Sequence, residues 1–183
     1  MTAPDQRLLA LARRGRSPNI DSALVTLTRA ANYSRLWLGA AAVIGATGGP
    51  RGRLAARRGL AALALASAVA NGPIKLAARR RRPPVDVAPS LVRMPRSTSF
   101  PSGHSASAFA FATGASLEQP ALGIVLVPLA GAVAYSRVHA GVHYPSDVAA
   151  GAAVGVGCAL LLRRFALAKR GDRPPAARTP AHR

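Results

Sequence analysis

The sequence predicts an all-α protein, a polytopic membrane helix bundle with five to six transmembrane helices. Half of its 183 residues are hydrophobic, yet aromatic residues make up only 4%, so its apolar surface is largely small and aliphatic. Five apolar runs carry no charged residue, and they leave too little polar sequence to cover them in water. The runs are Leu36–Pro50, Gly59–Ile74, Thr98–Leu117, Gln119–Ser136 and Val148–Leu162.

Several of these runs are shorter than the roughly 20 residues that span a bilayer, and short runs can also be buried helices of a soluble protein. Flanking arginines can lengthen a span because their charged ends reach the interface while their stems stay in the apolar layer. The last run contains Gly151 and Gly155, a GxxxG spacing that favours close helix packing. A membrane bundle therefore explains the runs better than a soluble domain.

The chain is expected to begin with a polar N-terminal segment, residues 1–16, that is loosely ordered at its start. It lacks a long apolar stretch, so we expect no cleavable signal peptide and assign membrane insertion to internal segments. Ser17 and Pro18 indicate a helix start. The helix that follows is amphipathic, with the stripe Ile20, Leu24, Leu27 and Ala31, and is either interfacial or a weak first span.

The membrane-embedded domain is assigned to residues 17–165, and residues 166–183 are predicted to be a disordered basic tail, because Pro, Arg and Ala dominate them without periodicity. Tyr33 and Trp37 are interpreted as aromatic anchors at the interface. The single Cys158 excludes a disulfide framework and a cysteine-based zinc site.

Counting one crossing per apolar run divides the polar segments between two sides. Segments 51–58, 118 and 163–170 fall on one side, and segments 75–101 and 137–147 fall on the other. The first side is rich in arginine and is therefore predicted to be cytoplasmic. The opposite, outward side is also basic, and the net charge is +19, so we expect an anionic partner: nucleic acid, anionic lipid or a phosphorylated substrate.

The segment Ser136–Asp147 holds an arginine, two histidines and a carboxylate in what reads as one short loop. An imidazole needs a partner to fix its tautomer before it attacks or moves protons. If a helix starts at Ser146, Asp147 lies in its first turn and can reach His143. Arg137 indicates a negatively charged ligand. The alternative is a polar interhelical loop with a satisfied histidine.

A phosphate needs several cations and N–H donors around its oxygens. Lys75, Arg82 and Arg137 fit this role. Ser102 and Gly103 stand where a helix would begin, so their N–H groups could bind an anion. No group of His, Cys and Asp has metal-ligand spacing, so no metal and no cofactor are expected, and these donors would have to stabilise a transferring phosphoryl group themselves.

Together the motifs resemble the type 2 phosphatidic acid phosphatase family, part of the superfamily of lipid phosphatases and vanadium haloperoxidase-like proteins. Lys75 to Arg82-Pro83 matches KxxxxxxRP, residues 101–104 match PSGH, and Ser136 to Asp147 matches SRxxxxxHxxxD. The resemblance covers about residues 20 to 165, which suggests a small bacterial membrane member.

The resemblance implies that His143 is a nucleophile forming a phosphohistidine, oriented by Asp147, and that His104 is first general acid and then general base. It further implies that the active site lies at the outer end of the bundle, facing the periplasm or the extracellular side of the cell membrane. His139 and His182 receive no role. The remaining arginines of the outward side (Arg79, Arg80, Arg81, Arg93 and Arg96) are interpreted as a solvated or headgroup-facing surface.

Three functions stay open at this point. The first is a lipid phosphatase acting on an isoprenoid carrier phosphate or diphosphate (undecaprenyl or decaprenyl), phosphatidic acid or phosphatidylglycerol phosphate, with a preference for isoprenoid or other cell-envelope lipids. The second is a vanadate-binding haloperoxidase-like or soluble-type acid phosphatase activity on the same fold. The third is a non-enzymatic basic protein that binds anionic lipid or nucleic acid, which would leave PSGH and the spacing of His143 and Asp147 unexplained.

Overall fold

The computed structural model describes residues 3–84 and 90–171, and over this part of the chain its regular elements are all helices, which confirms the predicted class. Short 3-10 turns (η1, η3) and a π-helical turn (η2) connect the α-helices. The α-helices are α1 Ala3–Arg14, α2 Pro18–Ala30, α3 Arg35–Thr47, α4 Gly49–Val69, α5 Lys75–Ala78, α6 Gly103–Ser116, α7 Gly123–His139 and α8 Pro145–Gly171.

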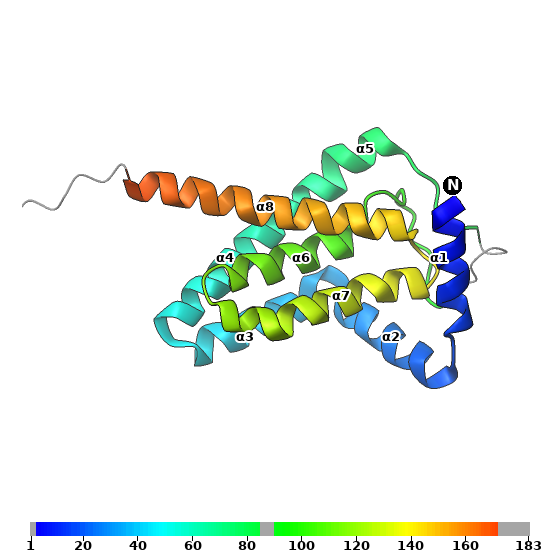
Figure 1. Ribbon diagram of the computed structural model, residues 1–183, viewed down its shortest axis with the longest axis horizontal. Coiled ribbons are helices and arrows are strands. Elements are labelled where there is room, and N and C mark those ends of the chain that lie inside the picture. Colours follow the sequence, from blue (N-terminus) through cyan, green and yellow to red (C-terminus); the bar gives the residue numbers. More distant parts are fainter. Residues whose placement is uncertain (1–2, 85–89, 172–183) are drawn as a thin grey trace, which may run out of the picture.

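Helix α6 is the centre of the bundle, with α4, α7 and α8 packed around it and α1 lying across one end (Figure 1). Most of its residues are buried, and many of them are alanines with no exposed surface, such as Ala106, Ala108 and Ala110. Phe111 fills the gap toward α3, where its ring centroid lies 5.5 Å from that of Trp37. Because small side chains line most of α6, its neighbours can approach its backbone closely.

The GxxxG pair of α8 provides the closest of these approaches. A Cβ atom on Gly151 would lie 2.4 Å from the Ser102 carbonyl oxygen, and one on Gly155 would lie 2.3 Å from the Ala106 carbonyl oxygen. Both glycines are buried. The predicted role of this pair in close packing is therefore confirmed, and the pair fixes α8 against the start of α6.

We expect Gly155→Ala to destabilise the protein by about 1–3 kcal/mol, because the added methyl group would push against backbone that cannot move aside. Gly157→Ala is the matched control: it lies half a turn further along the same helix, is exposed, and meets nothing within 4 Å. The control should be neutral or stabilising, because alanine favours helix over glycine by up to about 1 kcal/mol. Thermal unfolding in detergent measures both, and equal midpoints for the two variants would contradict the packing argument.

Within residues 3–84 and 90–171, three helical segments are long and apolar enough to cross a membrane: Gly49–Ala78, Pro120–His139 and Pro145–Ala168. Their outward faces carry large apolar side chains, among them Ile124, which is 78% exposed. Helices α3 and α6 have 13 and 14 residues. At roughly 1.5 Å per residue, α6 is about 21 Å long, shorter than a bilayer core of about 30 Å. Five or six crossings therefore remain a proposal.

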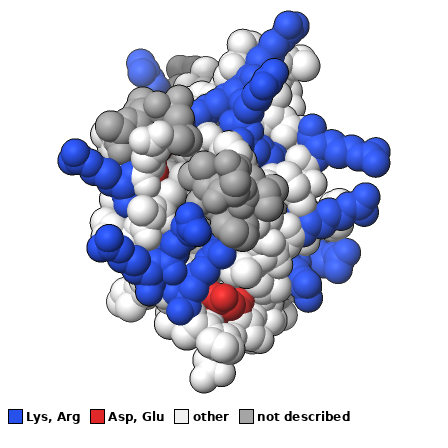
Figure 2. Space-filling view, turned by 90° about the vertical axis from the view of Figure 1, so that its right-hand side faces the viewer, with Lys and Arg blue, Asp and Glu red and all other residues white. Residues whose placement is uncertain are grey.

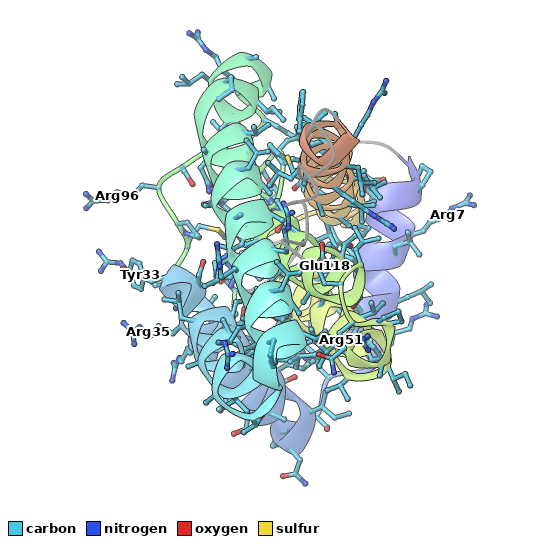
Figure 3. All side chains as sticks on the ribbon, turned by 90° about the vertical axis from the view of Figure 1, so that its left-hand side faces the viewer. Arg7, Tyr33, Arg35, Arg51, Arg96 and Glu118 are labelled. Atoms are coloured by element: carbon cyan, nitrogen blue, oxygen red, sulfur yellow. The ribbon has the colours of Figure 1, made fainter. Side chains whose placement is uncertain are left out.

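The polar segments lie at the two ends of the bundle, in the two sets that the crossing count predicted. Arg58 pairs with Glu118 at 3.5 Å, and both line a small cavity together with Arg163. Arg51 and Glu118 are labelled in the view of this end in Figure 3. The α5–α6 and α7–α8 connections lie at the opposite end, beside α1 (Figure 1).

Several expectations about local structure were wrong. The N-terminal segment is helical from residue 3, because residues 3–14 form α1, whose Leu9 is 2% exposed, so loose order could concern only residues 1–2, which lie outside the described part of the chain. Segment 51–58 is not a loop but the first half of α4. Trp37 is not an interfacial anchor, since it is 1% exposed in the core, whereas Tyr33 is 84% exposed.

The two ends of the last motif also differ from expectation. Arg137 and His139 belong to the last turn of α7, so the loop between the helices is only residues 140–144. Helix α8 continues to Gly171, which makes residues 166–171 of the predicted disordered tail helical. Residues 172–183 lie outside the described part of the chain.

Candidate phosphate site

A cavity of about 300 Å³ opens at the end of the bundle that α1 crosses. Its walls include six of the eight predicted site residues: Lys75, Arg82, Gly103, His104, Arg137 and His143. The other two, Ser102 and Asp147, lie directly behind the wall with no exposed surface. Lys and Arg side chains surround this end of the molecule, with little acidic surface between them (Figure 2). The fold therefore brings three distant motifs to one basic site.

The π-helical turn Ala70–Ile74 places Lys75 at the cavity. Gly72 has a non-helical backbone (φ −93°, ψ −107°), and Pro73 cannot donate a helical hydrogen bond, so the helix breaks its regular ladder here. The chain then resumes as α5, which begins at Lys75. The lysine Nζ lies 3.3 Å from the hydroxyl of Ser97, a residue of the segment that precedes α6.

Arg82 is held by oxygens of the backbone and of Ser97, and no carboxylate of a described residue pairs with it. Its Nη1 donates to the Val142 carbonyl at 2.7 Å, and its Nε donates to the Ser97 carbonyl at 2.9 Å. The same Nη1 lies 3.1 Å from Nε2 of His143. Burial lowers the pKa of Arg82, and the charge of Asp147 opposes this effect.

Arg137 is a buried cation with spare donors. It is 3% exposed, and its Nη1 donates to the Thr28 hydroxyl at 2.6 Å. Its Nε is buried without a hydrogen-bond partner among the described residues, which also provide no carboxylate within ion-pair distance of it. A buried guanidinium without a counter-ion is costly unless an anion binds beside it. Arg137 therefore points to an anionic ligand.

The tautomer of His143 follows from its neighbours. Arginine has donors and no acceptor, so Arg82 can hydrogen-bond His143 only if Nε2 of the imidazole carries a lone pair. The proton must then reside on Nδ1, which lies 3.5 Å from Oδ2 of Asp147, an ion-pair distance that is long for a hydrogen bond. The basic nitrogen thus faces Arg82, which lines the same cavity, and the protonated one faces the carboxylate.

Asp147 is fixed by a set of donors. Its Oδ2 accepts from the Tyr144 N–H at 2.9 Å and from the Ser99 hydroxyl in a short hydrogen bond. Its Oδ1 accepts from Nη1 of Arg80 at 2.7 Å. Asp147 also lies in the first turn of α8, as predicted, where the helix dipole favours a carboxylate.

Arg80 was misassigned to the solvated surface. Besides Asp147 it pairs with Asp5 of α1, at 2.6 Å between Nη2 and Oδ2, and its guanidinium lies 4.2 Å from the Tyr144 ring centroid. Asp5 is 2% exposed and also accepts from the Ser146 N–H and hydroxyl, at 3.0 and 2.8 Å. One arginine therefore links α1 to the carboxylate behind His143. Arg79 and Arg81 are exposed, as expected.

Ser102 and Gly103 begin α6, as predicted, but the two residues contribute differently. Ser102 is the N-cap, and its own N–H donates to the Asp147 carbonyl at 2.9 Å, so this group is not available to an anion. Gly103 lines the cavity in the first helical turn, where N–H groups lack intrahelical acceptors. A Cβ atom here would lie 2.6 Å from Oδ1 of Asn71, so glycine lets the helix start lie against the π-helical turn.

His104 follows Gly103 on α6 and lines the same cavity. Its Nε2 lies 2.9 Å from Oδ1 of Asn32, a residue of η1 that the motifs do not include. Because a carbonyl oxygen only accepts, Nε2 is the protonated nitrogen of this pair. His139, which received no role, pairs instead with Asp21 of α2 at 2.7 Å.

We expect the stability of the protein to fall as the pH drops from about 6.5 toward 4, with His143 as a main cause. Burial lowers the pKa of His143 to about 4, with Arg82 and Arg137 acting in the same direction and Asp147 opposing them. Between these pH values the unfolded chain binds a proton at this position and the folded protein does not, so stability rises with pH by up to about 3 kcal/mol across the window.

His143→Gln is the matched variant, since glutamine does not titrate. The unfolding midpoint in detergent, measured at half-unit pH intervals, should fall less steeply below pH 6.5 in the variant than in the wild type. Identical slopes would show that His143 does not titrate in this window. Above pH 6.5 the two profiles should run parallel.

The helical bundle and the site together define a class: a multi-pass membrane protein that holds three cations and a neutral histidine around one anion-sized cavity at one end. Comparison with known proteins identifies the family. Residues 56–170 match the sequence model of the PAP2 superfamily, and because they make up more than half of the chain, the protein belongs to that superfamily.

Two named relatives are similar in sequence to part of the chain. It is 45% identical over 84 residues to the decaprenylphosphoryl-5-phosphoribose phosphatase of Mycobacterium tuberculosis. These aligned residues make up 45% of this chain and 45% of that protein. It is 43% identical over 63 residues to the lipid A 1-phosphatase of Rhizobium johnstonii, covering 34% of this chain and 26% of that protein. The aligned region thus spans less than half the length of these relatives.

Two solved structures share the fold over most of the chain. The PAP2-type phosphatidylglycerolphosphate phosphatase of Bacillus subtilis superposes with a TM-score of 0.71 at 26% identity, covering 93% of this chain and 88% of that one. Aquifex aeolicus LpxE superposes with a TM-score of 0.75 at 24% identity, covering 89% and 96%. The resemblance read from the motifs is therefore confirmed for family and fold.

Proposed function

We propose that this protein is an integral membrane lipid phosphatase that removes a terminal phosphate through a phosphohistidine at His143. One observation carries the proposal. Lys75, Arg82 and Arg137 surround a single cavity without a carboxylate partner among the described residues, and His143, whose Nε2 accepts from Arg82, lines the same cavity. Three cations can stabilise the charge of a transferring phosphoryl group in the way that metal ions do elsewhere.

In the first step, Nε2 of His143 attacks phosphorus and the bond from phosphorus to the ester oxygen breaks. The departing oxygen takes a proton from His104, which enters this step as the imidazolium and leaves it neutral, so the lipid departs as an alcohol. Asp147 stabilises the positive charge that develops on the imidazole, and its own position is held by Ser99, Tyr144 and Arg80.

In the second step, His104 removes a proton from water, the water oxygen attacks phosphorus, and the bond between phosphorus and nitrogen breaks. Inorganic phosphate leaves and His143 returns to its neutral form. The same three cations serve both steps, because the charge on the phosphoryl oxygens is similar in the two transition states.

His104→Ala is expected to slow release from a lipid alkyl ester by roughly 10²-fold or more, the usual range for a lost general acid. An aryl phosphate should lose far less in its first step, because a phenolate departs without protonation. Pre-steady-state release of the aryl alcohol measures that step. Equal losses on both substrates would contradict the assignment of His104 as the acid.

For the substrate, we favour an isoprenoid-linked phosphate. The support is the 45% identity to a phosphatase named for a decaprenyl lipid. We also propose that α3 and α6 cross the membrane together with the three long helices, and that the site faces the periplasm or the extracellular side. The arginine-rich end around Arg51 and Arg58 would then be cytoplasmic.

Phosphate release by detergent-purified protein in EDTA tests the function. The substrates are an isoprenyl diphosphate, an isoprenyl phosphate, phosphatidic acid and a prenylphosphoryl-5-phosphoribose, each also tested on His143→Gln. Release that resists EDTA and disappears in the variant is the expected result. Release that needs an added divalent cation would contradict metal-independent catalysis. No release from any substrate would contradict the proposed function.

A further inference from the structure

A second cavity, of about 740 Å³, lies beside the phosphate cavity. The two share the lining residues Tyr33, Pro95, His104 and Arg137, so they adjoin each other. The outer walls of the second cavity are the end of α2 and the segment 92–96. Tyr33 and Arg96, which both line this cavity, lie on the same flank of the bundle in Figure 3.

The second cavity is strongly basic. Arg29, Arg93 and Arg96 line it in addition to the shared Arg137, and its described lining contains no Asp or Glu. All three additional arginines are exposed. None of them forms an ion pair with a described residue. Four cations around one hollow favour an anion within it, because their mutual repulsion is relieved only by negative charge.

The positions of the two histidines indicate what part of a substrate would occupy this space. His143 lines the first cavity and not the second, whereas His104 lies on the wall between them. In an in-line displacement the leaving oxygen departs on the side opposite the nucleophile, next to the acid that protonates it. The alcohol released in the first step therefore extends past His104 into the second cavity.

We propose that the second cavity binds an anionic group on this alcohol, so that the preferred substrates carry two separate anions: the terminal phosphate and a phosphodiester nearer the lipid tail. This inference rests on the proposed function and narrows its substrate class. Phosphatidic acid and an isoprenyl monophosphate release neutral alcohols and leave the arginines without a partner. A polyprenylphosphoryl-5-phosphoribose or a phosphatidylglycerol phosphate releases an alcohol that still carries a phosphodiester.

Two synthetic substrates that differ only in the second anion test the proposal. One is a prenylphosphoryl-ribose 5-phosphate, and the other is the O-prenyl riboside 5-phosphate, in which an uncharged glycosidic bond replaces the phosphodiester. The wild type should favour the first by about tenfold or more in kcat/KM, the value of one good charge-assisted contact. Raising the salt concentration should reduce this advantage, because the arginines are exposed.

The double variant Arg93→Gln/Arg96→Gln should reduce that preference by about threefold to tenfold, with Arg29→Gln acting in the same direction. Arg51→Gln is the matched control, since it removes an exposed arginine from the opposite end and should leave the preference unchanged. Unfolding midpoints are measured for each variant, so that a loss of folding is recognised.

A preference near one in the wild type, or one that the cavity variants leave intact, would overturn the second-anion site while the phosphatase activity stands. No phosphate release from either substrate by the wild type would instead overturn the proposed function. An equal loss on both substrates in the double variant would show that Arg93 and Arg96 serve the first phosphate, and would also overturn the proposal.

Discussion

His143→Gln is expected to lower phosphate release by roughly 10⁴-fold or more while the protein stays folded. The side chain is 2% exposed and its neutral form is the one that the fold favours, so glutamine of similar polarity can occupy the site without placing a charge there. The loss would come from the missing nucleophile, since a glutamine amide cannot form the phosphorylated intermediate.

A labelling measurement and a control variant separate the loss of the nucleophile from a general loss of structure. The substrate is labelled at its phosphate, and the reaction is stopped with alkali, because phosphohistidine survives alkali and not acid. Labelled protein should appear in the wild type and be absent from the variant. His139→Gln is the control, because glutamine can still donate to Asp21 in place of the histidine Nε2. Wild-type turnover by folded His143→Gln would remove this residue as the nucleophile.

Arg137→Met is expected to reduce kcat/KM by roughly 10²-fold or more without lowering the stability of the ligand-free protein. Methionine has a similar length and no charge, so the substitution removes a buried cation that has no carboxylate partner among the described residues. If Arg137 served stability and not catalysis, its replacement would lower the stability of the ligand-free protein and leave kcat/KM unchanged. Arg137→Lys should also be costly, because one ammonium cannot bond Thr28 and grip two phosphate oxygens together.

Vanadate provides the readout for binding alone. It should raise the unfolding midpoint of the wild type, since a ligand that binds only the folded state stabilises it, and it should raise that of Arg137→Met much less. Arg51→Gln, at the far end, should respond as the wild type does. A vanadate effect of full size in Arg137→Met would show that Arg137 does not contact the anion.

Much of the site could be predicted because its motifs are local in sequence and specific in chemistry. Ser102 was recognisable as a helix start and Gly151 as a packing residue, because each signal depends on near neighbours. The burial of Trp37 could not be predicted in the same way, since it depends on Phe111, 74 residues further along the chain.

The contacts of Arg80 were missed for the same reason, because they join three elements that are distant in sequence. One signal could have found them. The chain has 25 basic and six acidic residues, so each acid has a choice of partners and is rarely left unpaired. Asp5, Glu118 and Asp147 each pair with an arginine in the structure, and Asp21 contacts His139. Because Asp5 also needs a basic partner, its presence in residues 1–16 indicates that this segment packs against the rest of the chain.

The contacts of Asp5 also constrain the order in which the helices can assemble. Its partners Arg80 and Ser146 follow it by 75 and 141 residues, so α1 is synthesised first and yet can dock only after α8 has entered the membrane. Until then the carboxylate behind His143 lacks part of its support. A bulky fusion placed before α1 should therefore delay the gain of activity more than the insertion of the helices.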